Sequence, residues 1–303
     1  MKVLMIGGTA LIGPHLIAEL SRAGCDTVTL TRSGRTYFCE TALTGDRNDP
    51  SALEAAFNAA PDVVIDMIPF TAQDATHLLA AMGDNPPRLI ALSSADIYSA
   101  YGILHGTETA RFQSCPIPET GTLRTTLGAE GAAYDKLSVE RIYGGLDNVT
   151  FLRLPAVYGW PDTTRVLPYL DQMLDGATQI DIPADKAAFR FSRALHKNVA
   201  IAIALAVLKC AVGRHVYNVA EPKAYTEQDW IARIAQACGW QGKVNLTKWR
   251  RETPSPRQQL HLDTTLIRRE LGFEELYNVD EGLADCVAFH AYQRLGKPYT
   301  KYY

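Results

Sequence analysis

The chain has 303 residues, of which 47% are hydrophobic and 21% are charged, a balance typical of a globular protein. Its 33 acidic and 30 basic residues give a formal net charge of −3, which does not favour general binding to nucleic acid or to a membrane surface. The six cysteines show no Cys-x-x-Cys spacing, so we expect no metal site and no disulfide framework, and a reducing cytoplasmic location fits.

A glycine-rich turn close to Met1 is the strongest signal in the sequence. An apolar run at 3–6 leads into Gly7-Gly8-Thr9-Ala10-Leu11-Ile12-Gly13 and then into an amphipathic stretch, 11–20. A strand, a tight glycine turn and a helix start in this order are typical of a dinucleotide site, because the N–H groups of the helix start face the pyrophosphate. So early a turn also argues against a signal peptide. We predict that the cofactor is contacted by Gly7, Thr9, Ala10, Leu11, Ile12 and Gly13.

Strand-like and helix-like segments then alternate through the first half of the chain. We predict strands over 27–31, 62–68, 88–93 and 149–154, and helices over 51–60, 72–82 and 131–144. This rhythm is typical of α/β proteins with a doubly wound parallel sheet of the Rossmann type.

Beyond Gly159 the rhythm changes. We predict helices over 166–174, 198–208 and 226–238, short strands such as 216–219, and a proline-containing loop over 253–259. The apolar run near 199–208 is too short to span a bilayer and indicates a buried helix. We therefore expect a dinucleotide-binding domain over 1–160 and a smaller α+β substrate-binding lobe over 161–303, with some of its segments returning to the sheet.

The residues after the second strand indicate which dinucleotide binds. A carboxylate usually grips the ribose of NAD there, whereas this chain has Arg32, Ser33 and Arg35. Arginine forks and hydroxyl groups suit a 2′-phosphate, so we predict NADP, with NAD as the alternative. Both arginines could instead be solvated charges on a turn. Three further residues complete the predicted cofactor site: Asp46, which could also serve only as a turn residue, Arg47 and Pro155.

Several motifs together carry a family resemblance. They are the opening glycine turn, Ser93-Ser94-Ala95-Asp96-Ile97-Tyr98, Pro118-Glu119-Thr120 with Leu123-Arg124, Lys136-Leu137-Ser138-Val139-Glu140, and Arg153-Leu154-Pro155-Ala156-Val157-Tyr158-Gly159. The chain resembles the extended or atypical short-chain dehydrogenase/reductases, a group that includes nucleotide-sugar epimerases and dehydratases. The resemblance implies hydride transfer between a nicotinamide cofactor and a carbinol or carbonyl carbon of a small molecule.

The family's chemistry implies a serine, a tyrosine and a lysine in defined roles. Ser94 matches the serine that binds the substrate oxygen, and Lys136 matches the lysine that supports the tyrosine and the nicotinamide ribose. The family's tyrosine lies four residues before the lysine, but Ala132 stands there in this chain. The nearest tyrosine, Tyr134, lies two residues before Lys136 and would point to the opposite side of a regular helix.

Three explanations of this departure follow from the sequence. The helix could start late or bulge, so that Tyr134 acts beside Lys136. Another acid could replace the tyrosine, and the candidates at strand ends and nearby loops are Tyr98, Tyr101, Tyr158, Asp66 and Asp96. Alternatively, the protein could bind a nucleotide without catalysis, as a redox sensor or an RNA-binding relative, although its net charge argues against RNA.

Each candidate also has a purely structural interpretation. Ser94 could cap a turn, and Lys136 could pair with Glu140 one helical turn away. Arg190 and Arg193 lie where relatives bring an arginine near a substrate phosphate, but both could form ordinary ion pairs. The resemblance further implies a homodimer formed through helices around Lys136.

Overall fold

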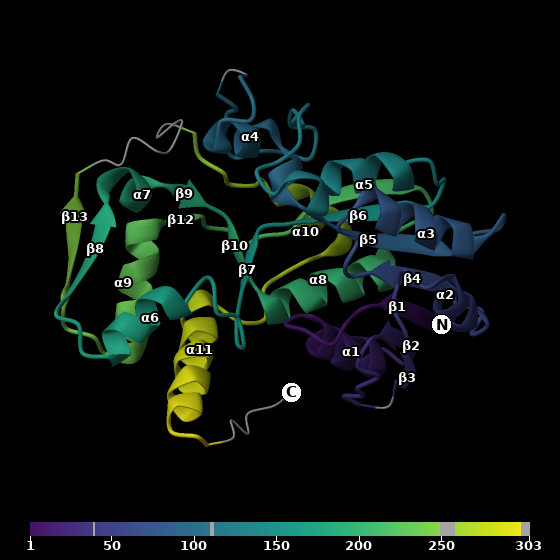
Figure 1. Ribbon diagram of the computed structural model, residues 1–303, viewed down its shortest axis with the longest axis horizontal. Helices are drawn as coiled ribbons and strands as arrows, with labels where there is room; N and C mark the ends of the chain where they lie inside the picture. The colour runs from purple at the N-terminus through teal and green to yellow at the C-terminus, as the bar shows by residue number, and fades with distance from the viewer. Residues whose placement is uncertain (39, 110–111, 249–257, 298–303) are drawn as a thin grey trace.

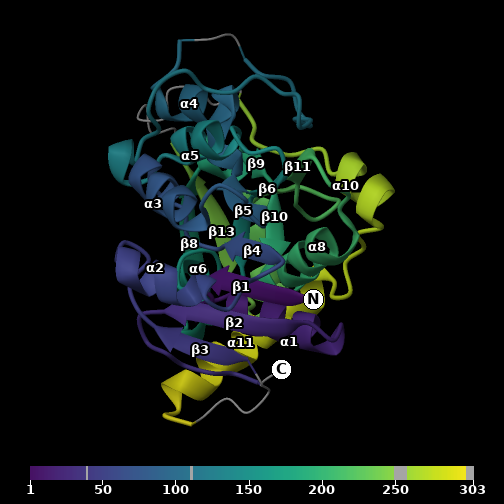
Figure 2. The ribbon, with the colours of Figure 1, turned by 90° about the vertical axis from the view of Figure 1, so that its right-hand side faces the viewer.

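A seven-stranded parallel sheet forms the centre of the molecule (Figures 1 and 2). The structure, a computed structural model, describes residues 1–38, 40–109, 112–248 and 258–297. The strands lie in the order β11-β6-β5-β4-β1-β2-β3, and every neighbouring pair is parallel. Their bounds are β1 Lys2–Ile6, β2 Asp26–Thr31, β3 Thr41–Thr44, β4 Val63–Asp66, β5 Arg88–Ser94, β6 Val149–Leu154 and β11 Arg214–Asn218. The predicted Rossmann-type sheet is confirmed.

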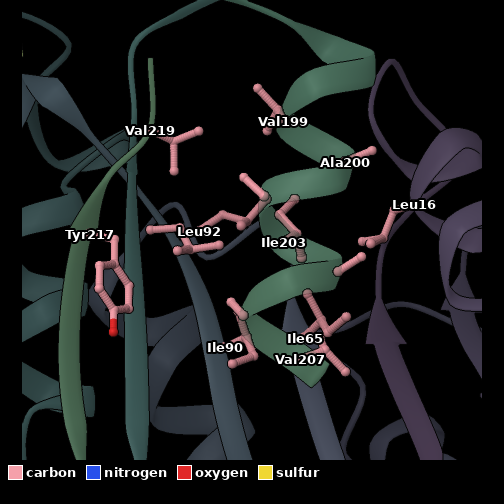
Figure 3. Close-up of a cluster of buried hydrophobic side chains, with 14 of the residues drawn as sticks. Leu16, Ile65, Ile90, Leu92, Val199, Ala200, Ile203, Val207, Tyr217 and Val219 are labelled. Atoms are coloured by element: carbon pink, nitrogen blue, oxygen red, sulfur yellow. The ribbon is translucent and has the colours of Figure 1, made fainter. Parts of the chain in front are cut away.

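Helices cover both faces of the sheet because successive strand residues point to opposite sides. Val3 and Met5 of β1 pack with α1 (Gly13–Arg22) and α8 (His196–Lys209), as Figure 3 shows for the cluster around α8. Leu4 and Ile6 pack in the opposite cluster, which is built on α2 (Pro50–Phe57), α3 (Ala72–Met82) and α5 (Lys136–Tyr143). Each face of the sheet therefore has its own apolar layer.

A smaller lobe lies beside the sheet and has a separate apolar cluster (Figure 1). Trp230 of α9 (Glu227–Cys238) lies in this cluster together with residues of α6 (Leu167–Leu174) and α11 (Val279–Arg294). The short strands pair as β7 (Ala156–Tyr158) with β10 (Arg193–Leu195), β8 (Gln179–Pro183) with β13 (Lys243–Thr247), and β9 (Arg190–Phe191) with β12 (Tyr225–Thr226). The remaining helical segments are η1 (Ala95–Ile97), α4 (Ser99–His105), η2 (Gly131–Ala133), α7 (Ala184–Ala188) and α10 (Thr265–Leu271).

Two segments beyond residue 160 belong to the sheet layer rather than to the lobe. Helix α8 packs against α1 and the sheet, and β11 pairs with β6 as an edge strand. No helix in the described part of the chain combines the length and apolarity that crossing a membrane requires. Most of the predicted proline-containing loop, 253–257, lies outside the described residues.

The predicted helix over 131–144 is wrong in its first part. The chain forms only a short 3₁₀ turn, η2, before Tyr134, and α5 begins at Lys136. The backbone N–H of Asp135 donates to the carbonyl of Phe70 at 2.7 Å, and the carboxylate of Asp135 accepts from Ser138. These contacts fix Asp135 outside the helix, so the chain changes direction between Tyr134 and Lys136.

Candidate active site

The glycine turn has the geometry that a dinucleotide cradle requires. Gly7 and Gly8 have φ angles of 93° and 111°, a region that favours glycine. A Cβ atom on Gly13 would lie 1.9 Å from the carbonyl oxygen of Gly8, so only glycine allows this close approach. Helix α1 starts at Gly13, directly after the loop formed by Thr9, Ala10, Leu11 and Ile12. The backbone N–H groups of its first turn, which have no partner within the helix, therefore lie next to this loop.

The predicted phosphate-binding residues after β2 lie on the surface beside this turn. Arg32, Ser33 and Arg35 are exposed, and no ion pair of either arginine is recorded within the described residues. The Ser33 hydroxyl accepts from the backbone N–H of Arg35 at 3.4 Å. Tyr37, in the same loop, contacts the glycine turn, because its hydroxyl donates to the carbonyl of Thr9 at 2.9 Å.

The two residues after β3 have different surroundings. Asp46 is exposed and accepts from the backbone N–H of Asn48, the turn role that the sequence also allowed. Arg47 is buried, and its guanidinium donates to both carboxylate oxygens of Asp66 at 2.6 and 3.1 Å and to the carbonyl of Asp74 at 2.9 Å. The geometry does not support the predicted contact between Arg47 and the cofactor, because its donors face the protein interior.

The structure brings Ser94, Tyr134 and Lys136 together beyond the end of β5. Tyr134 and Ser94 are close enough for hydrogen bonding with the Ser94 side chain to lower the pKa of Tyr134. Lys136 Nζ lies 5.3 Å from the centre of the Tyr134 ring and donates to the carbonyl of Leu92 at 3.0 Å. The break before α5 removes the regular helix that would have separated Tyr134 from Lys136. Glu140 pairs with Arg153 at 2.8 Å rather than with Lys136.

Lys136 is enclosed by aromatic side chains, among them Phe70 from the loop after β4. Its side chain is buried, and Nζ lies 4.8 Å from the centre of the Phe70 ring. Burial lowers the pKa of Lys136 to about 8, against attraction from Asp66 and Asp96. Phe70 was not among the predicted site residues, since an aromatic residue in a loop gives no sequence signal for this contact.

Asp96 is a second group with unusual protonation at the site. It lies one residue into η1, it is buried, and its Oδ1 has no hydrogen-bond partner. Burial raises the pKa of Asp96 to about 6, although hydrogen bonding with Ser94 and the charge of Arg124 act in the opposite direction. Ser94 also accepts from the backbone N–H of Asp96 at 3.3 Å, so Ser94 caps η1 as well as contacting Tyr134.

Burial raises the pKa of Tyr134 too, and repulsion from Asp96 and Glu130 adds to the effect. Tyr134 is therefore a proton donor rather than a ready base. The charge of Arg165, from the loop before α6, favours the ionised form of Tyr134. The site thus combines a neutral phenol, a hydroxyl, a weakly acidic carboxyl and a buried amine.

The remaining acid candidates are held in other contacts. The Tyr98 hydroxyl donates to Asn218 at 2.7 Å, and the Tyr158 hydroxyl donates to Glu221 at 2.8 Å. The Tyr101 hydroxyl donates to Glu130. Asp66 is wholly buried against Arg47. Pro155 follows β6 and is partly exposed, and no contact distinguishes it.

Arg193 does not face a substrate site. Its guanidinium is buried, pairs with Glu227, and lies 3.7 and 4.4 Å from the ring centres of Phe191 and Trp230. Arg190 donates to the carbonyl of Ala224. The ordinary ion-pair interpretation of the sequence therefore holds for Arg193.

Comparisons with known proteins bear on the family and the fold. The family model described as "NAD dependent epimerase/dehydratase family" matches residues 3–220. No curated protein matches the sequence. The fold is similar to the UDP-glucose-4-epimerase of Stenotrophomonas maltophila with bound NAD and formylated UDP-arabinopyranose, at 19% identity and a TM-score of 0.78, covering 97% of this chain and 99% of that one.

Two further solved structures show the same fold. The UDP-glucose 4-epimerase of Thermotoga maritima with UDP-glucose matches at 20% identity and a TM-score of 0.74, covering 97% of this chain and 100% of that one. The enzyme of Bifidobacterium longum in complex with NAD+ and UDP matches at 17% identity and a TM-score of 0.76, covering 98% and 100%. The glycine turn at β1 and the cluster around Ser94 both lie within the matched range.

Proposed function

The chain belongs to the NAD-dependent epimerase/dehydratase family, and from that premise we propose that it transfers hydride reversibly at a carbinol carbon of a sugar-like substrate. The observation that carries the proposal is the contact of Ser94, Tyr134 and Lys136 in one cluster. A dinucleotide with its pyrophosphate at the glycine turn would supply the hydride acceptor, its nicotinamide. The similar structures that hold UDP-sugars suggest nucleotide sugars as the first substrates to test.

We assign roles from the chemistry of each group. The Ser94 hydroxyl binds the substrate oxygen, and the Tyr134 hydroxyl exchanges a proton with it. Lys136 Nζ lies 5.3 Å from the centre of the Tyr134 ring, and we assign Lys136 the support of the nicotinamide ribose. Asp96 is the second candidate for proton transfer, because its pKa of about 6 suits exchange near neutral pH and it contacts Ser94.

Substitution separates these roles. Tyr134→Phe and Asp96→Asn each remove one proton-transfer group, and Ser94→Ala removes the substrate contact. The wild type is mixed with UDP-glucose and an oxidised dinucleotide, and the absorbance of reduced nicotinamide is followed. We expect the rate of its formation to be lower by roughly 10²-fold or more in the variant that loses the true acid–base group. Tight dinucleotide binding with no reduction by any UDP-sugar would favour the non-catalytic alternative.

We also propose NADP(H) as the preferred cofactor. The exposed Arg32 and Arg35 after β2 support a 2′-phosphate contact, although similar structures contain NAD. Titration with NADPH and NADH should show tighter binding of NADPH, and Arg32→Ala with Arg35→Ala should weaken NADPH selectively. Equal or tighter binding of NADH by the wild type would contradict this assignment.

A further inference from the structure

One guanidinium connects both ends of the loop that covers Lys136. The loop, residues 67–71, joins Asp66 at the end of β4 to helix α3, which contains Asp74. Arg47 donates to both oxygens of Asp66, and its Nε lies 3.4 Å from Asp74 Oδ1. Arg47 and Asp66 are both buried, so water does not screen their interaction strongly.

The same two carboxylates hold the loop backbone. Asp66 Oδ1 accepts from the N–H of Ile68 at 3.3 Å, and Asp74 Oδ2 accepts from the N–H groups of Phe70 and Thr71 at 2.9 and 2.8 Å. Charge-assisted hydrogen bonds of this kind are stronger than neutral ones. The loop conformation therefore depends on carboxylates whose own positions are fixed by Arg47.

The loop in turn places Phe70 over Lys136. The carbonyl of Phe70 accepts from the N–H of Asp135, and its ring lies 4.8 Å from Lys136 Nζ and 5.5 Å from the Tyr134 ring centre. The charged groups that act most strongly on Lys136 are Asp66 on β4, Asp96 on η1, Asp74 on α3 and Arg47 before α2. Asp66 also accepts a hydrogen bond from the Tyr143 hydroxyl of α5, at 2.6 Å.

We infer that Arg47, Asp66 and Asp74 form a positioning unit for Lys136, which holds Phe70 over the amine and sets the electrostatic field in which the amine works. The importance of Lys136 in this inference rests on the proposed function, whereas the contacts around Lys136 do not depend on it. These are positioning residues rather than catalytic ones, because none of them touches the cluster of Ser94 and Tyr134. Asp66 attracts the Lys136 proton and Arg47 repels it, so the two partners act with opposite sign.

A pH titration of Lys136, followed by the NMR chemical shift of its Cε in ¹³C-labelled protein, tests this opposition. The wild type should show a midpoint near 8. Arg47→Met should raise the midpoint and Asp66→Asn should lower it, each by about half a pH unit or more, while the double variant should return towards the wild type. Shifts in the same direction, or no shift in either variant, would overturn the inference.

Hydrogen exchange provides a readout if a charge-deleting variant does not fold. Arg47→Lys keeps the charge but cannot bridge two carboxylates, so exchange at the amides of residues 68, 70 and 71 should accelerate. Arg141→Met, which removes an exposed arginine from α5, is the matched control and should leave exchange unchanged. Unchanged exchange in Arg47→Lys would refute the positioning role. A wild type that binds neither NADPH nor NADH would instead refute the proposed function and leave the titration result valid.

Discussion

Lys136 Nζ lies 5.3 Å from the centre of the Tyr134 ring, although only one residue separates the two in the sequence. On a continuous helix the two side chains would diverge by about 200°. They meet because Tyr134 has φ and ψ of −145° and 83°, outside the helical region. The missing family tyrosine at position 132 therefore does not leave Lys136 without a phenol beside it.

The first prediction concerns Asp96 and stability. Its pKa is raised to about 6, so the folded state holds a proton that the unfolded state releases between pH 4 and 6. Stability contributed by this proton is lost as pH rises through about 6. Asp96→Asn should therefore be more stable than the wild type at pH 7, by roughly 3 kcal/mol at most, and nearly equal at pH 4.

Urea unfolding at both pH values measures the effect. Glu130→Gln is a matched control, because Glu130 is an exposed carboxylate near the same tyrosine. A constant difference between Asp96→Asn and the wild type at pH 4 and 7 would mean that Asp96 does not titrate as the geometry indicates.

The second prediction has the opposite pH dependence. Burial lowers the pKa of Lys136 to about 8, so above pH 8 the unfolded state binds more protons than the folded state. Wild-type stability should gain from this group as pH rises from 8 to 10. The stability of Lys136→Met relative to the wild type should accordingly decline over that interval, by up to roughly 3 kcal/mol.

Unfolding in urea at pH 7.5 and pH 10 gives both values. Lys209→Met is the matched control, since Lys209 also donates to a backbone carbonyl, at 3.0 Å, but lies on an exposed helix end. If the two lysine variants change equally with pH, Lys136 is not the source of the difference.

The sheet and the cofactor turn could be predicted because local sequence determines them. The apolar strand segments that alternate with helical ones, and the glycine turn from Gly7 to Gly13, each have their own conformational preferences. The late start of the helix before Lys136 was one of three explanations that the sequence allowed, and the sequence could not select it because the interruption depends on a bond between Asp135 and the distant Phe70. Local propensity yields to a tertiary contact there.

Arginines were the least predictable site residues. Arg47 follows Asp46 directly, yet one is buried and the other exposed. The sequence does not reveal that Asp66, nineteen residues later, lies beside Arg47. Helix α11 was missed because its apolar residues form no single stripe, although Asn278 and Glu281 form a capping box that signals its start.

The third prediction concerns Gly13. In Gly13→Ala the new methyl group would lie 1.9 Å from the carbonyl oxygen of Gly8, a backbone atom that cannot move away alone. We expect a loss of about 1–3 kcal/mol in unfolding free energy and loss of NADPH binding by fluorescence titration. Gly145→Ala is the control, because its methyl group would lie 3.4 Å from Ile142 and makes an ordinary contact. Retained NADPH affinity in Gly13→Ala would show that the turn does not hold the dinucleotide.

The fourth prediction tests the buried pair of Arg193 and Glu227. Glu227→Ala leaves the guanidinium buried between the rings of Phe191 and Trp230 without its carboxylate, because Arg193 is only 1% exposed. Such a loss costs about 3–5 kcal/mol, so the urea midpoint should fall markedly. Asp147→Asn removes the carboxylate of the exposed pair with Arg214 and should change stability by less than about 1 kcal/mol. Equal effects of the two substitutions would mean that Arg193 reaches water once Glu227 is removed, and its assignment as an internal residue would then fail.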